Sequence, residues 1–184
     1  MDALGIDQFV KRLEAENHKI PAFLKTAVGQ SFYRVTDGEL RYLVADGSYR
    51  GLQRDAGVTR FKEERRTHRP LLHNRAASYF DLGRDIGLVE FHSKANVLDS
   101  YSMHLLAEAV EHATANFRGI VIHNDAAHFS CGVNLGSILN YIGNGDFSGL
   151  DRFLDHFQQT LKAMKNAAIP VVAAPSGLSL GGGF

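Results

Sequence analysis

Cysteine and long apolar runs are what this sequence of 184 residues most clearly lacks. Its one cysteine, Cys131, excludes an internal disulfide framework and any metal site built from several cysteines. No apolar run approaches the length of a membrane span. The first residues, Met1-Asp-Ala-Leu-Gly-Ile6, also lack the basic start and apolar core of a secretory signal. We therefore expect a cytoplasmic protein with no membrane span.

An excess of charge of one sign is also missing, because Lys+Arg and Asp+Glu both number 20. No net field then attracts nucleic acid or an acidic membrane surface, and we expect no nucleic-acid partner. Basic residues do gather between Gly51 and Arg75, in a polar stretch that also contains Glu63 and Glu64. A solvated linker over residues 51–76 is the favoured interpretation, and a patch for nucleic acid or phosphate groups is the alternative.

The first 50 residues combine one helical pattern with one hairpin pattern. Over residues 2–17 apolar side chains recur at spacings of three and four, which predicts an amphipathic helix. Two β-prone runs, residues 31–35 and 40–45, are joined by Thr36-Asp-Gly-Glu39, and Asp-Gly is a strong hairpin signal. We interpret residues 1–50 as a small appendage of mixed helix and sheet.

Residues 77–184 follow a different pattern, in which strands alternate with helices. A hairpin is expected over residues 77–92, and Asp99 or the next residue can cap the helix that follows. A short apolar strand at 119–123 precedes a helical stripe at 150–164, and another apolar strand is expected at 170–174. This alternation predicts an α/β domain with parallel strands.

Glycine gathers at two places where the chain leaves an expected strand. Gly132 lies within residues 128–135, and Gly177 and Gly181-Gly-Gly183 follow the strand expected at 170–174. A backbone without Cβ atoms can approach a ligand closely. Two such turns can point amide N–H groups at one spot, which is the geometry of an oxyanion hole. A tight strand-to-helix turn is the alternative interpretation of the triplet taken alone.

In order and spacing, residues 129–135 (Phe-Ser-Cys-Gly-Val-Asn-Leu) and 170–183 resemble the signature of the crotonase (enoyl-CoA hydratase/isomerase) superfamily. The resemblance covers residues 78–184. Within it, residues 80–83 and 89–98 are most similar to the hydratase part of bifunctional 3-hydroxyacyl-CoA dehydrogenase/enoyl-CoA hydratases. The fold class implied is α/β: a partial crotonase-like ββα spiral over 77–184 with a small N-terminal α+β appendage. Because the chain stops directly after the glycine triplet, we expect a fragment of a longer protein.

The resemblance also implies a site. The backbone amides of Val133 and Gly182 would form the oxyanion hole. The residues implied to contact the substrate are Lys94, Ala95, Cys131, Gly132 and Gly181. No metal is implied. Asn134 and Ser176 stand where the family usually has aspartate and asparagine, and we interpret both as side chains that stabilise turns.

The function implied is the enoyl-CoA hydratase step of fatty-acid β-oxidation, with acyl-CoA as the substrate and no cofactor in this chain. NAD is expected only for an upstream dehydrogenase part, and no Gly-x-Gly-x-x-Gly opens a strand–helix unit here. Hydration in the family usually needs two glutamates, and the first would directly follow Phe184, so we expect the chain by itself to be inactive.

Two alternatives stay open at the level of the sequence. One is another crotonase-type reaction of an acyl-CoA, such as isomerisation, thioester hydrolysis or decarboxylation, because this scaffold uses one oxyanion hole for many reactions. The other is a non-catalytic module that binds acyl-CoA. The oligomeric state is left open, a homo-oligomer included.

Overall fold

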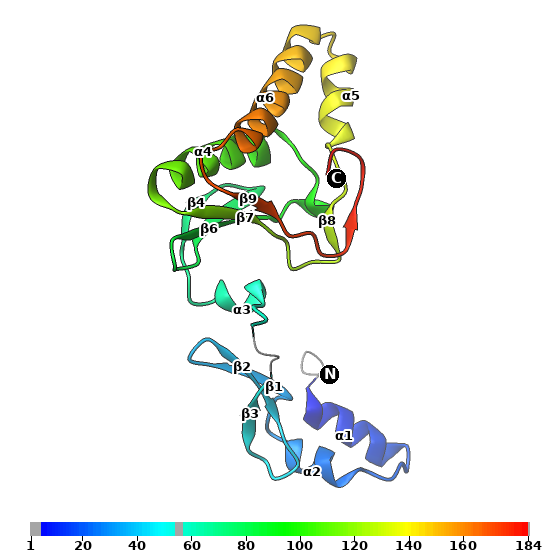
Figure 1. Cartoon of the computed structure of the whole chain (residues 1–184). Coiled ribbons are helices and arrows are strands. Elements are labelled where there is room, and N and C mark those ends of the chain that lie inside the picture. The colour runs from blue at the N-terminus through cyan, green and yellow to red at the C-terminus, as the bar shows by residue number, and fades with distance from the viewer. Residues whose placement is uncertain (1–4, 54–56, 184) are drawn as a thin grey trace. The chain divides into compact units, whose positions relative to one another are not determined.

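The computed structural model describes residues 5–53 and 57–183. The chain divides into two compact units, Met1–Thr67 and His68–Phe184 (Figure 1). Residues 51–76, which the sequence analysis interprets as a linker, contain the helix α3 (Phe61–Glu64) and the strand β4 (Pro70–His73). Because β4 pairs with the strand that follows it, this part of the segment belongs to the main sheet of unit 2.

Unit 1 holds a small antiparallel sheet and short helices. Its elements are α1 (Ile6–Ala15), α2 (Ala22–Ala27), β1 (Tyr33–Thr36), β2 (Glu39–Leu43), β3 (Tyr49–Gly51) and α3. The strands follow the order β1-β2-β3, and the buried residues of the unit's core are Ile6, Val10, Ala27 and Leu43. The predicted first helix is confirmed from Ile6 onward, while residues 2–4 of that prediction lie outside the described residues.

The hairpin predicted around Asp37 and Gly38 is confirmed. Thr36 pairs with Glu39 across a two-residue turn. The turn residues have φ values of 53° and 78°, in the left-handed region that this type of hairpin turn requires and that Gly adopts without cost.

Unit 2 is an α/β arrangement around one five-stranded sheet. Its elements are β4, β5 (Ala77–Asp81), β6 (Ile86–Phe91), η1 (Lys94–Asn96), α4 (Ser100–Asn116), β7 (Gly119–Ile122), β8 (His128–Ser130), α5 (Leu135–Gly143), α6 (Phe147–Lys165), β9 (Val171–Ala173), β10 (Leu178–Ser179) and η2 (Gly181–Gly183). The strand order in the sheet is β4-β5-β6-β7-β9. The pairs β4–β5 and β5–β6 are antiparallel, whereas β6–β7 and β7–β9 are parallel. The predicted hairpin and the predicted parallel strands are therefore confirmed.

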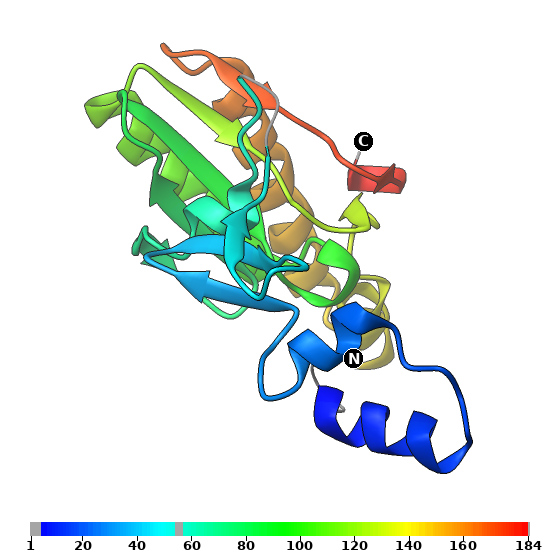
Figure 2. The same ribbon diagram turned by 90° about the horizontal axis from the view of Figure 1, so that it is seen from below.

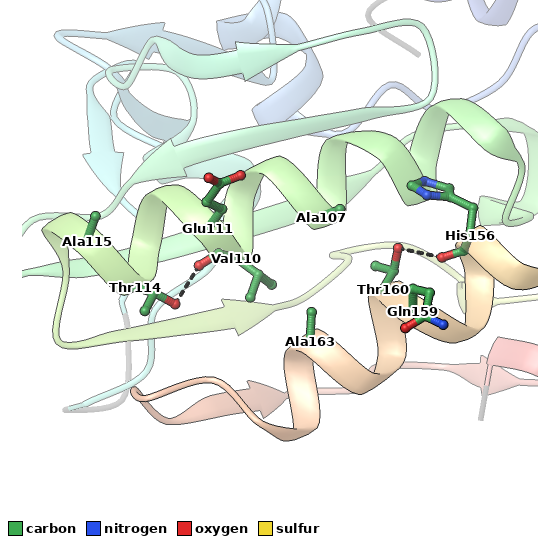
Figure 3. A pocket seen from close by; sticks show the side chains of 9 residues that line it. All are labelled: Ala107, Val110, Glu111, Thr114, Ala115, His156, Gln159, Thr160 and Ala163. Carbon is green, nitrogen blue, oxygen red and sulfur yellow. Dashed lines mark hydrogen bonds between the residues drawn. The ribbon is translucent and has the colours of Figure 1, made fainter.

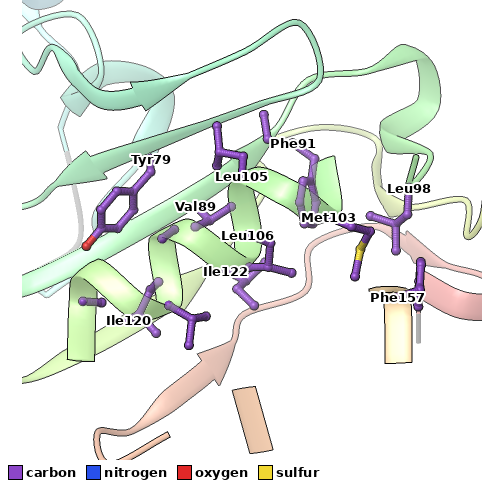
Figure 4. Packing of buried hydrophobic residues seen from close by; sticks show 14 of the residues in the cluster. Tyr79, Val89, Phe91, Leu98, Met103, Leu105, Leu106, Ile120, Ile122 and Phe157 are labelled. Carbon is purple, nitrogen blue, oxygen red and sulfur yellow. The ribbon is translucent and has the colours of Figure 1, made fainter. Parts of the chain in front are cut away.

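Helix α4 covers one face of this sheet and supplies much of the core (Figure 4). Leu105 and Leu106 from the helix lie against Val89 and Ile122 from the strands, and each of these side chains is almost fully buried. The helix begins at the predicted cap. The Asp99 carboxylate accepts a hydrogen bond from the Ser102 N–H at 2.9 Å, and the Ser102 hydroxyl accepts one from the Asp99 N–H at 2.8 Å.

Two features lie outside the main sheet. Helices α5 and α6 lie side by side as a helical pair (Figure 1). Strands β8 and β10 form a short parallel pair of their own (Figures 1 and 2), which brings the chain after β8 next to the glycine-rich chain after β10. Within residues 5–53 and 57–183, no helix is both long and apolar enough to cross a membrane.

Candidate functional site

The two glycine-rich turns of unit 2 touch each other. Gly132, two residues beyond the end of β8, has a φ of +83°, a left-handed value that residues other than glycine rarely adopt. A Cβ atom at this position would lie 2.7 Å from the Leu180 carbonyl oxygen and 3.1 Å from the Gly182 nitrogen. Both the conformation and the contact with the second turn therefore require glycine at position 132.

The amides of Val133 and Gly182 lie on this contact. Val133 forms a bridge with Leu98, in which the Leu98 N–H donates to the Gly132 carbonyl at 2.8 Å and the Asn134 N–H donates to the Leu98 carbonyl at 2.8 Å. Since this bridge uses the groups on either side of Val133, the Val133 N–H itself points away from Leu98. A Cβ atom built on Gly182 would lie 3.8 Å from the Val133 nitrogen.

Neither amide donates a hydrogen bond to another of the described residues. In η2 it is the Gly183 N–H that donates, to the Leu180 carbonyl at 2.9 Å. The structure thus places together the two residues that the sequence paired, each with a free N–H group. That the two amides bind one oxygen atom stays a prediction.

Ser130 and Asn96 hold the first turn in place, and the sequence predicted a role for neither. The buried Ser130 hydroxyl donates to the Asn96 carbonyl at 2.8 Å and accepts from the Gly132 N–H at 3.1 Å. The Asn96 side-chain amide donates to the His128 carbonyl at 2.7 Å. The two bonds that involve Asn96 join residues more than 30 positions apart, so no local sequence signal could have revealed them.

The predicted substrate-contacting residues gather around the same turns. Ala95 lies in η1, and its carbonyl accepts a hydrogen bond from the Cys131 N–H at 3.2 Å. Lys94 is exposed beside it, while Cys131 is half-buried and is a free thiol. Gly181, with a φ of +52°, precedes the Gly182 amide, and a Cβ atom there would meet open space. Asn134 caps α5 by accepting from the Gly136 N–H at 3.0 Å, the turn-stabilising role predicted for it.

An apolar hollow of about 120 Å³ borders the second turn. Its lining residues are Phe91, Leu98, Met103, Leu106, Ile122, Phe129, Ser130, Leu161, Met164, Ala173, Gly182 and Gly183. An uncharged lining of this kind lowers the local dielectric constant, which strengthens hydrogen bonds made by neighbouring backbone donors.

A larger hollow, of about 500 Å³, lies in the groove between α4 and α6 (Figure 3). The Thr114 and Thr160 hydroxyls that line it donate to the carbonyls of Val110 and His156 in their own helices. None of the predicted site residues lines this groove, so it is separate from the candidate site. In the described part of the chain, no three or more His, Cys, Asp and Glu residues are grouped so that they could hold a metal ion.

No protein-family model matches the sequence. Over 184 residues, or 99% of the chain, it is 32% identical to a Bacillus subtilis (strain 168) protein named as a probable 3-hydroxyacyl-CoA dehydrogenase. Over 91 residues, or 50% of the chain, it is 34% identical to a protein of Rickettsia prowazekii (strain Madrid E) provisionally named as a fatty acid oxidation complex trifunctional enzyme. The chain spans 23% of the length of the first relative and 13% of the second.

Solved structures resemble the fold. An enoyl-CoA hydratase from Bacillus halodurans matches with a TM-score of 0.54 and 20% identity, over 59% of this chain and 45% of that one. An enoyl-CoA hydratase/carnithine racemase from Magnetospirillum magneticum matches with a TM-score of 0.53 and 19% identity, over 60% of this chain and 42% of that one. At these sequence identities, the two solved structures show a similarity of fold alone.

Proposed function

We propose that this chain is the enoyl-CoA hydratase part of a fatty-acid β-oxidation enzyme. The starting point is its crotonase fold, which covers about 60% of its length. The observation that carries the proposal is the contact between the Gly132 turn and η2, in which neither the Val133 nor the Gly182 amide donates a hydrogen bond to another described residue. The names of the two relatives support it, because one refers to 3-hydroxyacyl-CoA and the other to fatty acid oxidation.

In the proposed reaction the thioester carbonyl oxygen of an enoyl-CoA accepts hydrogen bonds from the Val133 and Gly182 amides. Addition of water to the double bond moves negative charge onto this oxygen, so an enolate forms between the two donors. Backbone donors that are already fixed stabilise this charge without reorganising, which lowers the barrier to its formation. The general acid and the general base are assigned to no residue of this chain.

A dehydrogenase step that uses NAD would belong to another part of such an enzyme. The name of the Bacillus subtilis relative supports this step, and that protein is about four times as long as the present chain. The sequence contains no Gly-x-Gly-x-x-Gly to hold a dinucleotide. Within this chain the proposed ligand is therefore acyl-CoA alone.

Acetoacetyl-CoA tests the proposed oxyanion hole directly. Its enolate absorbs near-ultraviolet light, and a site that stabilises the enolate raises the enolate fraction at fixed pH. We expect the chain to raise this fraction. In Gly132→Ala the stabilisation of the enolate should fall by a factor of roughly 10² or more, the usual cost of losing one oxyanion donor. The matched control is Gly143→Ala at the end of α5, where a Cβ atom meets nothing within 4 Å.

The two outcomes separate the candidate functions. An enolate signal that Gly132→Ala removes and Gly143→Ala keeps supports the hole. Binding of acetoacetyl-CoA with no rise in the enolate fraction would favour a non-catalytic acyl-CoA-binding module, and it would refute the assignment of Val133 and Gly182.

A further inference from the structure

Two histidines of the main sheet converge on one hydroxyl group. His73 ends β4, His92 directly follows β6, and Ser78 lies on β5 between these strands. The Ser78 Oγ lies 2.9 Å from His73 Nδ1 and 2.9 Å from His92 Nε2. The two imidazole rings are stacked, with centroids 5.3 Å apart and planes inclined by 25°. Two ring nitrogens thus point at the same place from the two sides of one strand.

The tautomers of the two rings decide where their lone pairs face. A serine hydroxyl has one hydrogen and two lone pairs, so Ser78 can donate to one of the two ring nitrogens and can accept from one or both. A facing nitrogen offers a lone pair to an ion when its neutral ring carries the proton on the far nitrogen, and a shift of tautomer changes no charge.

From this geometry we propose that His73 and His92 chelate a divalent transition metal ion of the imidazole-preferring group, such as Ni²⁺, Cu²⁺ or Zn²⁺. Imidazole suits these ions, and zinc, for example, lies about 2.0–2.1 Å from its nitrogen ligands. Both histidine side chains are exposed, so their rings can rotate toward a shared ion without disturbing the core. The Ser78 hydroxyl and water complete the coordination.

One acidic residue lies on the same face of the sheet. Glu90 pairs with Ser78 across β5 and β6, and alternation along the strands puts its side chain on the same face as Ser78 and His92. Glu90 itself is buried. Within the described ranges no third His, Cys, Asp or Glu joins a metal-holding group, so the two imidazoles are the main ligands.

Such an ion would link the end of β4 to the segment that follows β6. That segment continues within two residues to η1, which carries Lys94 and Ala95. Because the ion binds the folded sheet and not the separated strands, it raises the stability of unit 2 as its concentration exceeds its dissociation constant. The inference does not depend on the proposed reaction.

Titration of the whole chain with Ni²⁺ tests the site, since this ion is paramagnetic and does not oxidise the Cys131 thiol. In an NMR titration we expect the ring signals of His73 and His92 to broaden first. The matched comparison is the pair His104 and His156, whose ring centroids are 6.1 Å apart and which share no hydrogen-bonding atom. By calorimetry, His73→Ala and His92→Ala should each weaken Ni²⁺ binding at least tenfold, whereas His104→Ala should leave it unchanged.

Equal broadening of all four rings would overturn the proposal, as would unchanged Ni²⁺ affinity in both His73→Ala and His92→Ala. The NMR titration uses the unaltered protein, so it decides the question even where a variant folds poorly.

Discussion

Tyr79 is a fully buried side chain of unit 2, and its ring lies over Gly87 on the neighbouring strand. A Cβ atom at position 87 would lie 2.6 Å from a ring carbon and 2.7 Å from the hydroxyl oxygen of Tyr79. The ring is fully buried, and its hydroxyl lies 3.3 Å from His112 Nδ1. We therefore expect Gly87→Ala to lower the free energy of unfolding by about 1–3 kcal/mol through overpacking.

Urea unfolding of Gly87→Ala beside Gly143→Ala measures this effect. Gly143 is helical and has no atom within 4 Å of its added Cβ, so alanine there should be neutral or slightly stabilising. Equal midpoints for the two variants would contradict the steric account of Gly87.

The same tyrosine predicts a loss of stability in alkali. Burial, and to a smaller extent the charge of Asp81, raise the pKa of the Tyr79 phenol above its ordinary value of 10.0. Above pH 10 the unfolded chain ionises this phenol while the folded chain keeps it protonated. The contribution of Tyr79 to the free energy of unfolding is thus complete below pH 10. It is lost as the pH rises above 10, by up to about 1.4 kcal/mol per pH unit.

Tyr79→Phe should remove this part of the pH dependence, as measured by urea unfolding between pH 9 and pH 11. Tyr101→Phe is the control, since Tyr101 is 45% exposed whereas Tyr79 is fully buried. If both variants keep the full alkaline slope, the buried phenol is not its source.

Site residues differ in how far the sequence could predict them. Val133 and Gly182 were paired because their motifs resemble a family signature, and the structure places them together. Ser130 and Asn96 were missed because their roles consist of tertiary hydrogen bonds across more than 30 residues. A serine or an asparagine gives no sign of such a partner in its local sequence.

Helix α4 is the element on which the core of unit 2 depends, and its N-terminal cap can be tested. Asp99 is buried, and its carboxylate satisfies the Ser102 N–H. Asp99→Ala removes this acceptor and should lower the free energy of unfolding by roughly 0.5–2 kcal/mol. Asp99→Asn keeps an acceptor oxygen and should restore most of the loss. If the alanine and asparagine variants unfold at the same urea concentration, the cap does not contribute as described.

At the scale of elements, local signals predicted the structure where a turn motif or an apolar run marks the element. The Asp37-Gly38 turn and the hairpin of β5 and β6 are of this kind. Strands β4, β8 and β10 were not predicted as strands, because each is defined by its pairing and not by a pattern in its own residues. Residues 51–76 were interpreted as a linker because their polar and basic composition does not reveal that β4 pairs with β5.

For the whole molecule, the balance of charge has a direct consequence. Positive and negative side chains cancel when histidine is neutral, and the isoelectric point lies near 7.1. A protein with a net charge near zero has little electrostatic repulsion between copies, which favours association. Helix α5 adds apolar contact area, since Leu135 and Leu139 are 68% and 67% exposed and have no charged residue beside them in the helix.

We therefore expect attraction between molecules to be strongest near pH 7, close to the isoelectric point, and to weaken toward pH 5.5, where the net charge of the chain is positive. Static light scattering at low salt measures this as an increase in the second virial coefficient on acidification. Added salt should reduce the difference, because it screens repulsion between the charged copies. Leu139→Glu should raise the coefficient at pH 7 by adding charge to the apolar face of α5. Equal coefficients at the two pH values, with folding verified by circular dichroism, would show that net charge does not control the association.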